Sequence, residues 1–188
     1  MEALTRGGSL IRVVVTGSES TGKSQLAERL ARHYDAELVP EFVRAFAEER
    51  EGVINFADHG PIARGQMELE DRHIAVAERG SGLVIQDTDL LSTVVYCEHY
   101  FGGCPQWIVD AASERRPDLY LLMEIDVPWV ADGVRDRGHL RVEMQELFRS
   151  AVVTSRSAYA VIEGSWENRW PLAVKAVDTQ LAGSSGSS

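Results

Sequence analysis

Cysteine is scarce in this sequence, which contains only Cys97 and Cys104 among its 188 residues. The two lie too far apart for a CxxC pair, and no histidine–cysteine cluster with zinc-ligand spacing surrounds them. These absences argue against a disulfide-stabilised secreted domain and against a structural zinc site. We expect both thiols to be reduced, as in a cytoplasmic protein.

Long hydrophobic runs are also missing. No apolar stretch approaches the roughly 18 residues that a membrane helix needs, and the first residues, MEALTRGGSLIR, lack the apolar region of a signal peptide. We therefore expect a soluble protein that is not exported and that acts in the cytoplasm.

Positive charge is in short supply. The formal net charge is -10, and the pI is near 5.0. A general affinity for nucleic acid or for an anionic membrane needs a basic surface, so we expect neither as a partner. A small-molecule substrate is the better expectation.

Hydrophobic residues make up 44% of the sequence, which is enough for one compact core. We expect a single domain over residues 1–182, followed by a flexible tail over 183–188, where the sequence GSSGSS is of low complexity.

Short apolar runs alternate along the chain with stretches of helical spacing. Strands are expected at about residues 10–16, 36–40, 83–86, 118–124 and 158–163, and helices at about 23–34, 41–50, 61–79, 89–101, 105–115, 141–156 and 171–181. The alternation predicts an α/β fold with a mostly parallel five-stranded sheet and helices on both faces. Ligands of such sheets bind at the carboxyl ends of the strands.

The segment GSESTGKS, residues 17–24, follows the first expected strand and fits the phosphate-loop pattern G-x-x-x-x-G-K-[ST] in full. Gly17 and Gly22 permit backbone N–H groups to converge on a phosphate, Lys23 reaches the terminal phosphates, and Ser24 offers a hydroxyl to Mg²⁺. We expect a nucleotide to contact Gly17, Glu19, Ser20, Thr21, Gly22, Lys23, Ser24 and Gln25.

A phosphate loop alone does not separate a kinase from a GTPase switch or a mechanical ATPase. No NKxD guanine-recognition sequence follows the fourth expected strand, and the chain is short for a mechanical ATPase. The features at the other strand ends are closer to those of a kinase.

Acidic residues follow two of the strands. Asp87, after LVIQ, falls where a P-loop enzyme holds Mg²⁺, together with Ser24, and Asp89 follows as a candidate substrate ligand. The alternative is that either aspartate merely caps the next helix, an alternative that is stronger for Asp89 than for Asp87. Glu41, after the second strand, can accept the proton of a substrate hydroxyl with Arg44 one turn on, although the two can also form a plain solvated ion pair. Whether Glu41 or Asp87 is the base stays open.

The stretch WVADGVRDRGHLR, residues 129–141, carries three arginines with glycines between them. Such a segment can close over the transferring phosphoryl group as a lid, with Arg135 and Arg137 as catalytic residues and Arg141 at the nucleotide. The alternative is an exposed loop in which aspartates pair with the arginines. Aromatic side chains near the strand ends can stack on a flat ring or belong to the core. The candidates for substrate contact are Phe42, Tyr100, Trp107 and Trp129.

Several strings together resemble one family, the nicotinamide riboside kinase (ribosylnicotinamide kinase) domain of NadR-type proteins. They are GSESTGKS, VPEFVR, ARGQMELED, QDTDLLSTVVYCEHYFGGCPQW, DLYLLMEIDVPWVADGVRDRG and VIEGSWENR, in order from residue 12 to about 170. The resemblance implies a P-loop kinase fold, ATP with Mg²⁺, and transfer of the γ-phosphoryl group to the ribose 5′-hydroxyl of nicotinamide riboside. The product would be nicotinamide mononucleotide, for NAD synthesis.

The resemblance also implies roles for particular residues. The family's phosphate loop falls on residues 17–24, its DTD motif on Asp87 and Asp89, and its lid on residues 129–141. The loop at residues 164–169 would flank adenine, with Trp166 or Arg169 in contact. The VPE segment further resembles deoxynucleoside kinases, whose glutamate after the second strand is the base, which favours Glu41.

One departure from the family matters. NadR-type proteins commonly carry a nucleotidyltransferase domain ahead of the kinase, whereas here only about ten residues precede the first expected strand. We therefore expect neither adenylylation nor DNA-bound regulation. Two alternatives remain open, a kinase of another nucleoside-like acceptor and a nucleotide-dependent switch without a small acceptor. A deep aromatic-lined pocket beside the phosphate loop would favour a kinase.

Overall fold

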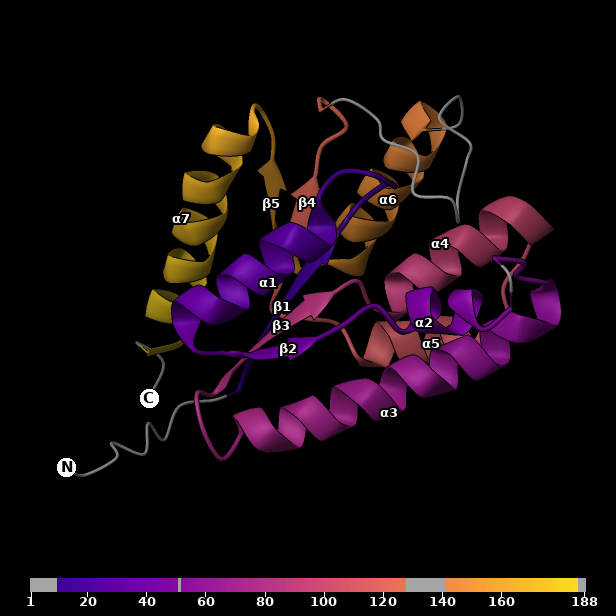
Figure 1. Ribbon diagram of the computed structural model, residues 1–188, viewed down its shortest axis with the longest axis horizontal. Coiled ribbons are helices and arrows are strands. Elements are labelled where there is room, and N and C mark those ends of the chain that lie inside the picture. The colour runs from indigo at the N-terminus through magenta and orange to yellow at the C-terminus, as the bar shows by residue number, and fades with distance from the viewer. Residues whose placement is uncertain (1–9, 51, 128–140, 186–188) are drawn as a thin grey trace.

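The computed structural model describes residues 10–50, 52–127 and 141–185. Within these residues, one five-stranded sheet has the order β2-β3-β1-β4-β5, and all of its strand pairs are parallel (Figure 1). The strands are β1 (Ile11–Thr16), β2 (Glu37–Val39), β3 (Leu83–Asp87), β4 (Leu119–Met123) and β5 (Ala158–Ile162). The predicted parallel α/β fold is confirmed.

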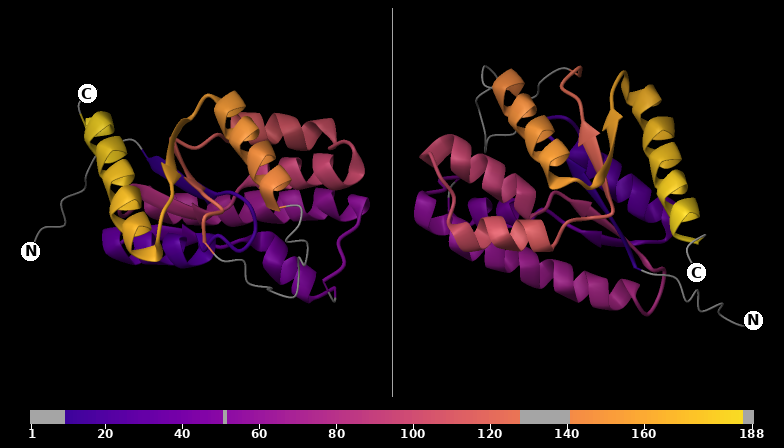
Figure 2. Two further views of the ribbon diagram at one scale, coloured as in Figure 1. Left: turned by 90° about the horizontal axis from the view of Figure 1, so that it is seen from above. Right: turned by 180° about the vertical axis from the view of Figure 1, so that it is seen from behind.

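The central strands are apolar on both sides because helices cover both faces of the sheet. Side chains alternate across β1: Val13 and Val15 pack in the cluster formed with α1 and α7, while Val14 packs with residues of α4 and α6. Val84 of β3 packs against α3 on the same face as Val14. Helices α1 and α7 thus cover one face, and α3, α4 and α6 the other (Figure 2).

Helices connect the strands in the expected order. They are α1 (Lys23–Tyr34), α2 (Phe42–Glu48), α3 (His59–Ala77), α4 (Leu90–Phe101), α5 (Gln106–Glu114), α6 (Arg141–Ser155) and α7 (Trp166–Ser185), with a short 3₁₀ turn η1 (Phe56–Asp58) before α3. Every loop that leaves the carboxyl end of a strand therefore lies at one edge of the sheet. The phosphate loop leaves β1, the central strand of this sheet.

The last helix differs most from expectation. Pro171 is expected in the first turn, where its missing N–H costs nothing, but α7 begins at Trp166 and contains Pro171 in its interior. The helix also ends at Ser185, so it includes the first residues of the expected tail. The domain boundary at residue 182 therefore stays a prediction.

Two further observations bear on the expectations. Cys97 and Cys104 are free thiols. In the described part of the chain, every helix is too short or too polar to cross a membrane.

Candidate active site

The phosphate-loop segment joins the end of β1 to the start of α1. Gly17 has a φ of 128°, and a Cβ atom there would lie 2.7 Å from the carbonyl oxygen of Met123. Gly22 has a φ of 83°, and a Cβ atom there would lie 2.4 Å from the ring of Trp166. Both glycines are therefore required by the backbone conformation and by the close approach of β4 and α7.

Two buried side chains hold the loop from within. Lys23 donates through Nζ to the carbonyl oxygen of Ser18 at 2.8 Å, and Thr21 donates through Oγ1 to the same oxygen at 2.9 Å. The ammonium group of Lys23 thus lies against the backbone of the loop, where the sequence motif predicts phosphate contact.

Helix α6 supports the loop from the side of β4. Gln145 accepts through Oε1 from the N–H of Ser18 at 3.1 Å and donates through Nε2 to the carbonyl of Met123 at 2.9 Å. Arg141, a predicted nucleotide contact, donates through Nη2 to the carbonyl of Ser20 at 3.2 Å. Sequence reasoning missed Gln145, for which the only signal is its place one helical turn after Arg141.

Arg169 links the loops at the ends of three strands. Its guanidinium donates to the carbonyls of Thr21 at 2.8 Å, Gly164 at 3.0 Å and Glu124 at 2.8 Å, and it forms an ion pair with Asp126. The residue is only 2% exposed. All three guanidinium nitrogens thus donate to protein carbonyls, so Arg169 holds the phosphate loop against the loops that follow β4 and β5.

A cavity of about 210 Å³ lies beside the phosphate loop and the start of α7. Its lining consists of Gly22, Gln25, Leu26, Arg29, Met123, Trp166, Arg169 and Trp170. The ring of Trp166 is about half exposed, and the guanidinium of Arg169 lies 5.1 Å from its centroid. The structure therefore brings together four residues that the sequence predicts at the nucleotide: Gly22, Gln25, Trp166 and Arg169.

Asp87 ends β3 beside the phosphate loop. The side chain of Ser24 lies near its carboxylate, while Oδ1 is buried and has no hydrogen-bond partner within the described part of the chain. Burial raises the pKa of Asp87, and the negative charge of Glu41 raises it further, against the opposing effects of Ser24 and Lys23. An unpartnered carboxylate oxygen beside a hydroxyl is a donor set that suits a hard cation such as Mg²⁺.

No group of three or more His, Cys, Asp or Glu side chains that could hold a metal occurs among residues 10–50, 52–127 and 141–185. A cation beside Asp87 would therefore take most of its ligands from a bound molecule and from water. This is the usual way in which Mg²⁺ binds with nucleotide phosphates.

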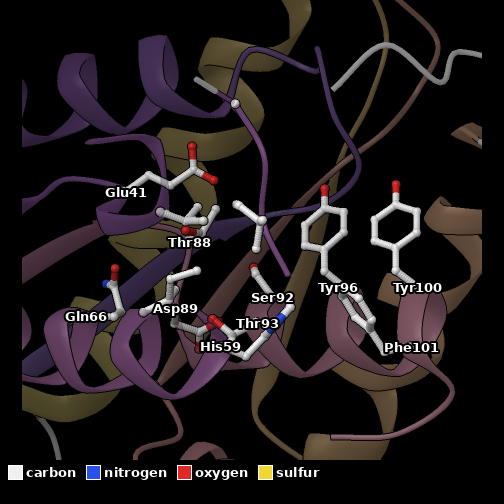
Figure 3. A pocket seen from close by; sticks show the side chains of 14 residues that line it. Glu41, His59, Gln66, Thr88, Asp89, Ser92, Thr93, Tyr96, Tyr100 and Phe101 are labelled. Carbon is white, nitrogen blue, oxygen red and sulfur yellow. The ribbon is translucent and has the colours of Figure 1, made fainter. Parts of the chain in front are cut away.

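A second cavity, of about 390 Å³, opens beside Glu41. Figure 3 shows Glu41, Thr88 and Asp89 on one side of it and the rings of Tyr96, Tyr100 and Phe101 on the other. The complete lining is Glu41, Val43, Gly52, Ile54, His59, Ile62, Gln66, Thr88, Asp89, Ser92, Thr93, Tyr96, Tyr100 and Phe101. Its wall includes the stacked rings of Tyr96 and Tyr100, whose centroids are 6.1 Å apart with planes at 10°.

Asp89 both caps α4 and lines this cavity. Its Oδ1 accepts from the N–H of Leu91 at 3.1 Å, and its Oδ2 accepts from the hydroxyl of Tyr120 at 2.7 Å. Burial raises the pKa of Asp89 to about 6 despite the hydrogen bond from Tyr120. The two roles that the sequence leaves open for this residue are thus compatible.

The other residues predicted at the substrate divide into three groups. Arg44 donates to Glu41 through Nη2 at 3.3 Å and is half exposed. The rings of Phe42 and Trp107 are outside the cavity lining: Phe42 packs on Gly65 of α3, and Trp107 lies under the guanidinium of Arg64, 4.8 Å from it. Trp129, Arg135 and Arg137 lie outside the described residues.

Sequence reasoning also missed part of the cavity wall. Ser92 and Thr93 follow Asp89 at helical spacing, so they share the α4 face that carries Tyr96 and Tyr100. That spacing was a usable signal. Gln66 comes from α3 and lies within ARGQMELED, a string that supports the family resemblance but for which the sequence predicts no site role.

Comparison with known proteins identifies relatives. The sequence matches the AAA domain family over residues 12–169. It is similar to the trifunctional NAD biosynthesis/regulator protein NadR of Escherichia coli (strain K12), with 31% identity over 141 residues, and of Salmonella typhimurium (strain LT2), with 31% identity over 130 residues. The matches cover 72% and 67% of this chain but 34% and 31% of the relatives, so the chain spans about a third of the length of the curated relatives it matches.

Solved structures share the fold. NadR in complex with NR is 26% identical to this chain, with a TM-score of 0.75. The structural match covers 95% of this chain and 53% of that chain. NadR in complex with NAD and AMP-PNP is 24% identical, with a TM-score of 0.73 over 95% of this chain and 51% of that chain. Thymidylate kinase from Ehrlichia chaffeensis is 16% identical, with a TM-score of 0.64 over 92% of this chain and 98% of that chain. The last two comparisons support the fold alone.

Proposed function

We propose that this chain, which belongs to the AAA domain family and is homologous to NadR, is an ATP-dependent kinase of nicotinamide riboside. The reaction transfers the γ-phosphoryl group of ATP to the ribose 5′-hydroxyl and gives nicotinamide mononucleotide. The NadR structure in complex with NR supports the acceptor, and the phosphate-loop sequence at residues 17–24 supports a nucleotide donor.

One observation carries this proposal: the acceptor-sized cavity meets the phosphate loop at a pair of carboxylates. Glu41 lines the cavity, its negative charge raises the pKa of Asp87, and Asp87 lies near Ser24 of the loop. Thr88 and Asp89, the two residues that follow Asp87, also line the cavity. Asp87 pairs with Val15 near the end of β1, from which the phosphate loop leaves. Phosphoryl transfer depends mainly on such positioning and on electrostatic stabilisation.

The phosphate loop binds the triphosphate through its backbone N–H groups and the N-terminus of α1. Lys23 exchanges its bond to the Ser18 carbonyl for the terminal phosphates. The residues assigned to this role are Gly17, Glu19, Ser20, Thr21, Gly22, Lys23, Ser24 and Gln25. Trp166 flanks adenine in the smaller cavity, while Arg141 and Arg169 hold the loop in shape.

Ser24 and Asp87 hold Mg²⁺. The hydroxyl and the unpartnered buried Oδ1 supply two oxygen ligands. When bound there, the cation neutralises charge on the phosphates during transfer.

Glu41 is the base, and Asp87 is the metal ligand. Glu41 lines the cavity and forms an ion pair with Arg44, whereas Asp87 lies near Ser24 and is absent from the residues that line the cavity. Asp89 and the stacked tyrosines bind the acceptor, with a flat ring against the aromatic wall. Trp129, Arg135 and Arg137 remain the predicted lid residues.

The test is ADP release from Mg-ATP with and without nicotinamide riboside, with the product identified by mass spectrometry. Acceptor-dependent ADP and a matching mononucleotide are expected. Turnover with a different riboside alone would keep the kinase and replace the acceptor. Slow hydrolysis of ATP at the same rate with and without every riboside tested would disprove the kinase function and favour a nucleotide-dependent switch.

A further inference from the structure

Helix α2 begins immediately after Glu41, and its N-terminus is capped in an unusual way. The first backbone N–H groups of a helix have no partner within the helix, and the residue before it commonly supplies one from its own side chain. Glu41 makes no such bond. The N–H of Phe42 instead donates to Oε1 of Gln66, in α3, at 3.1 Å.

The orientation of the Gln66 amide is itself fixed. Its Nε2 donates to Oε1 of Glu70 at 3.3 Å, so Oε1 is the atom that faces Phe42. The other oxygen of Glu70 accepts from Arg12 at 3.3 Å and from Arg115 at 3.1 Å. Gln66 is 4% exposed and Glu70 is 1% exposed. The cap of α2 is therefore anchored in a buried, charge-compensated cluster.

A second contact reaches the same residue of α2. The ring of Phe42 lies over Gly65, where a Cβ atom would be 2.1 Å from the ring. Glycine destabilises a helix interior relative to alanine, and here its use is explained by the ring above it. Two adjacent residues of α3 thus fix the backbone and the side chain of the first residue of α2.

We propose that Gly65 and Gln66 are positioning residues that hold the carboxylate of Glu41 at the acceptor cavity. This inference rests on the proposed function, in which Glu41 is the base. Gln66 fixes the backbone N–H of Phe42, the residue directly after Glu41. The side chain of Glu41 makes no cap bond of its own and reaches Arg44 and the cavity wall. Gln66 also lines the cavity, but both of its polar atoms are engaged with the protein. It therefore acts through Glu41.

The test is a double-mutant cycle between Gln66→Met and Glu41→Gln. Methionine keeps the length of the side chain and removes both polar atoms. Alone, Gln66→Met should lower kcat with nicotinamide riboside about tenfold to hundredfold and leave the KM for ATP within about twofold, because a small displacement of a catalytic group is costly. In the Glu41→Gln background it should cost less than about twofold. An equal loss in both backgrounds would overturn the proposal.

Gln106→Met is the matched control. Gln106 also donates to a carboxylate four residues later on a helix, Asp110, at 2.9 Å, but it is exposed on α5. Its replacement should leave kcat unchanged. Gly65→Ala perturbs the start of α2 in a different way, because it displaces the Phe42 ring and leaves the hydrogen bonds of Gln66 in place. It should reproduce the loss of kcat, so the proposal stays testable if Gln66→Met fails to fold.

Amide hydrogen exchange separates this inference from the proposed function. Exchange over residues 41–48 should be about tenfold faster in Gln66→Met, or in Gly65→Ala, than in the unaltered chain. This measurement needs no acceptor. If the unaltered chain does not phosphorylate nicotinamide riboside but the variants exchange faster, the proposed acceptor is disproved and the cap by Gln66 is kept. Unchanged exchange in the variants would disprove the cap.

Discussion

Arg169 donates through Nη1 to the backbone carbonyl of Thr21 at 2.8 Å, a contact between residues 148 positions apart. The same guanidinium also reaches the carbonyls of Gly164 and Glu124. One side chain thus fixes the phosphate loop against the ends of β4 and β5. Its planar, multi-donor shape is the property that lysine lacks.

Arg169→Lys should therefore destabilise the fold and weaken ATP binding. A single ammonium cannot satisfy three separated carbonyls, and each buried carbonyl left unpaired costs about 1–3 kcal/mol. We expect a loss of about 2–4 kcal/mol in urea unfolding and a raised KM for ATP. The matched control is Arg32→Lys, in an exposed pair with Glu28 at 3.8 Å, which should cost under about 0.5 kcal/mol. Equal unfolding midpoints for both variants would contradict this assignment.

Lys23→Ala should abolish turnover without unfolding the protein. In the proposed function its ammonium binds the terminal phosphates, so we expect at least about a hundredfold loss in ADP release. Lys175→Ala is an apt control, since it removes the only other lysine, an exposed one on α7. Turnover retained in Lys23→Ala would rule out the phosphate-loop role.

The sequence was sufficient where the site is made by neighbouring residues. The phosphate loop is one contiguous segment, and Asp87 and Asp89 follow a run of apolar residues that is typical of a buried parallel strand. Their partners in space were also foreseeable, because the carboxyl ends of parallel strands share one edge of the sheet.

Residues that reach the site through helix packing were not foreseeable. Gln145 contacts Ser18, 127 positions away, and Gln66 contacts Phe42, 24 positions away. The residues around each glutamine in the sequence do not indicate these distant partners. Trp107 shows the reverse case. Its position beside the cavity motifs predicts a substrate contact, whereas the structure places its ring under Arg64 and outside the cavity lining, so the contact stays a prediction.

Glu41→Gln and Asp87→Asn should both reduce turnover but respond differently to metal. A weakened metal site is partly refilled at higher Mg²⁺, whereas a missing base is not replaced by the cation. We expect high Mg²⁺ to restore part of the activity of Asp87→Asn and none of that of Glu41→Gln. The measurement is a Mg²⁺ titration of kcat at saturating ATP. Rescue of Glu41→Gln alone would exchange the two assignments.

Asp89 should make folding stability depend on pH. Burial raises the pKa of Asp89 from 3.8 to about 6, beside Tyr120, Glu70 and Arg12. The folded state therefore holds the proton more tightly than the unfolded state does. This contribution to stability is fully present below pH 3.8 and is lost as the pH rises through about 6.

Asp89→Asn removes the titration while keeping an oxygen that can accept from the N–H of Leu91. Between pH 5 and pH 8, the stability of Asp89→Asn relative to the unaltered chain should rise by about 1–2 kcal/mol. Urea unfolding at both pH values measures this difference. Any constant change in packing or in the bond to Tyr120 appears equally at both pH values and cancels. A difference that is the same at pH 5 and pH 8 would therefore show that the carboxyl group of Asp89 does not titrate in this range on folding.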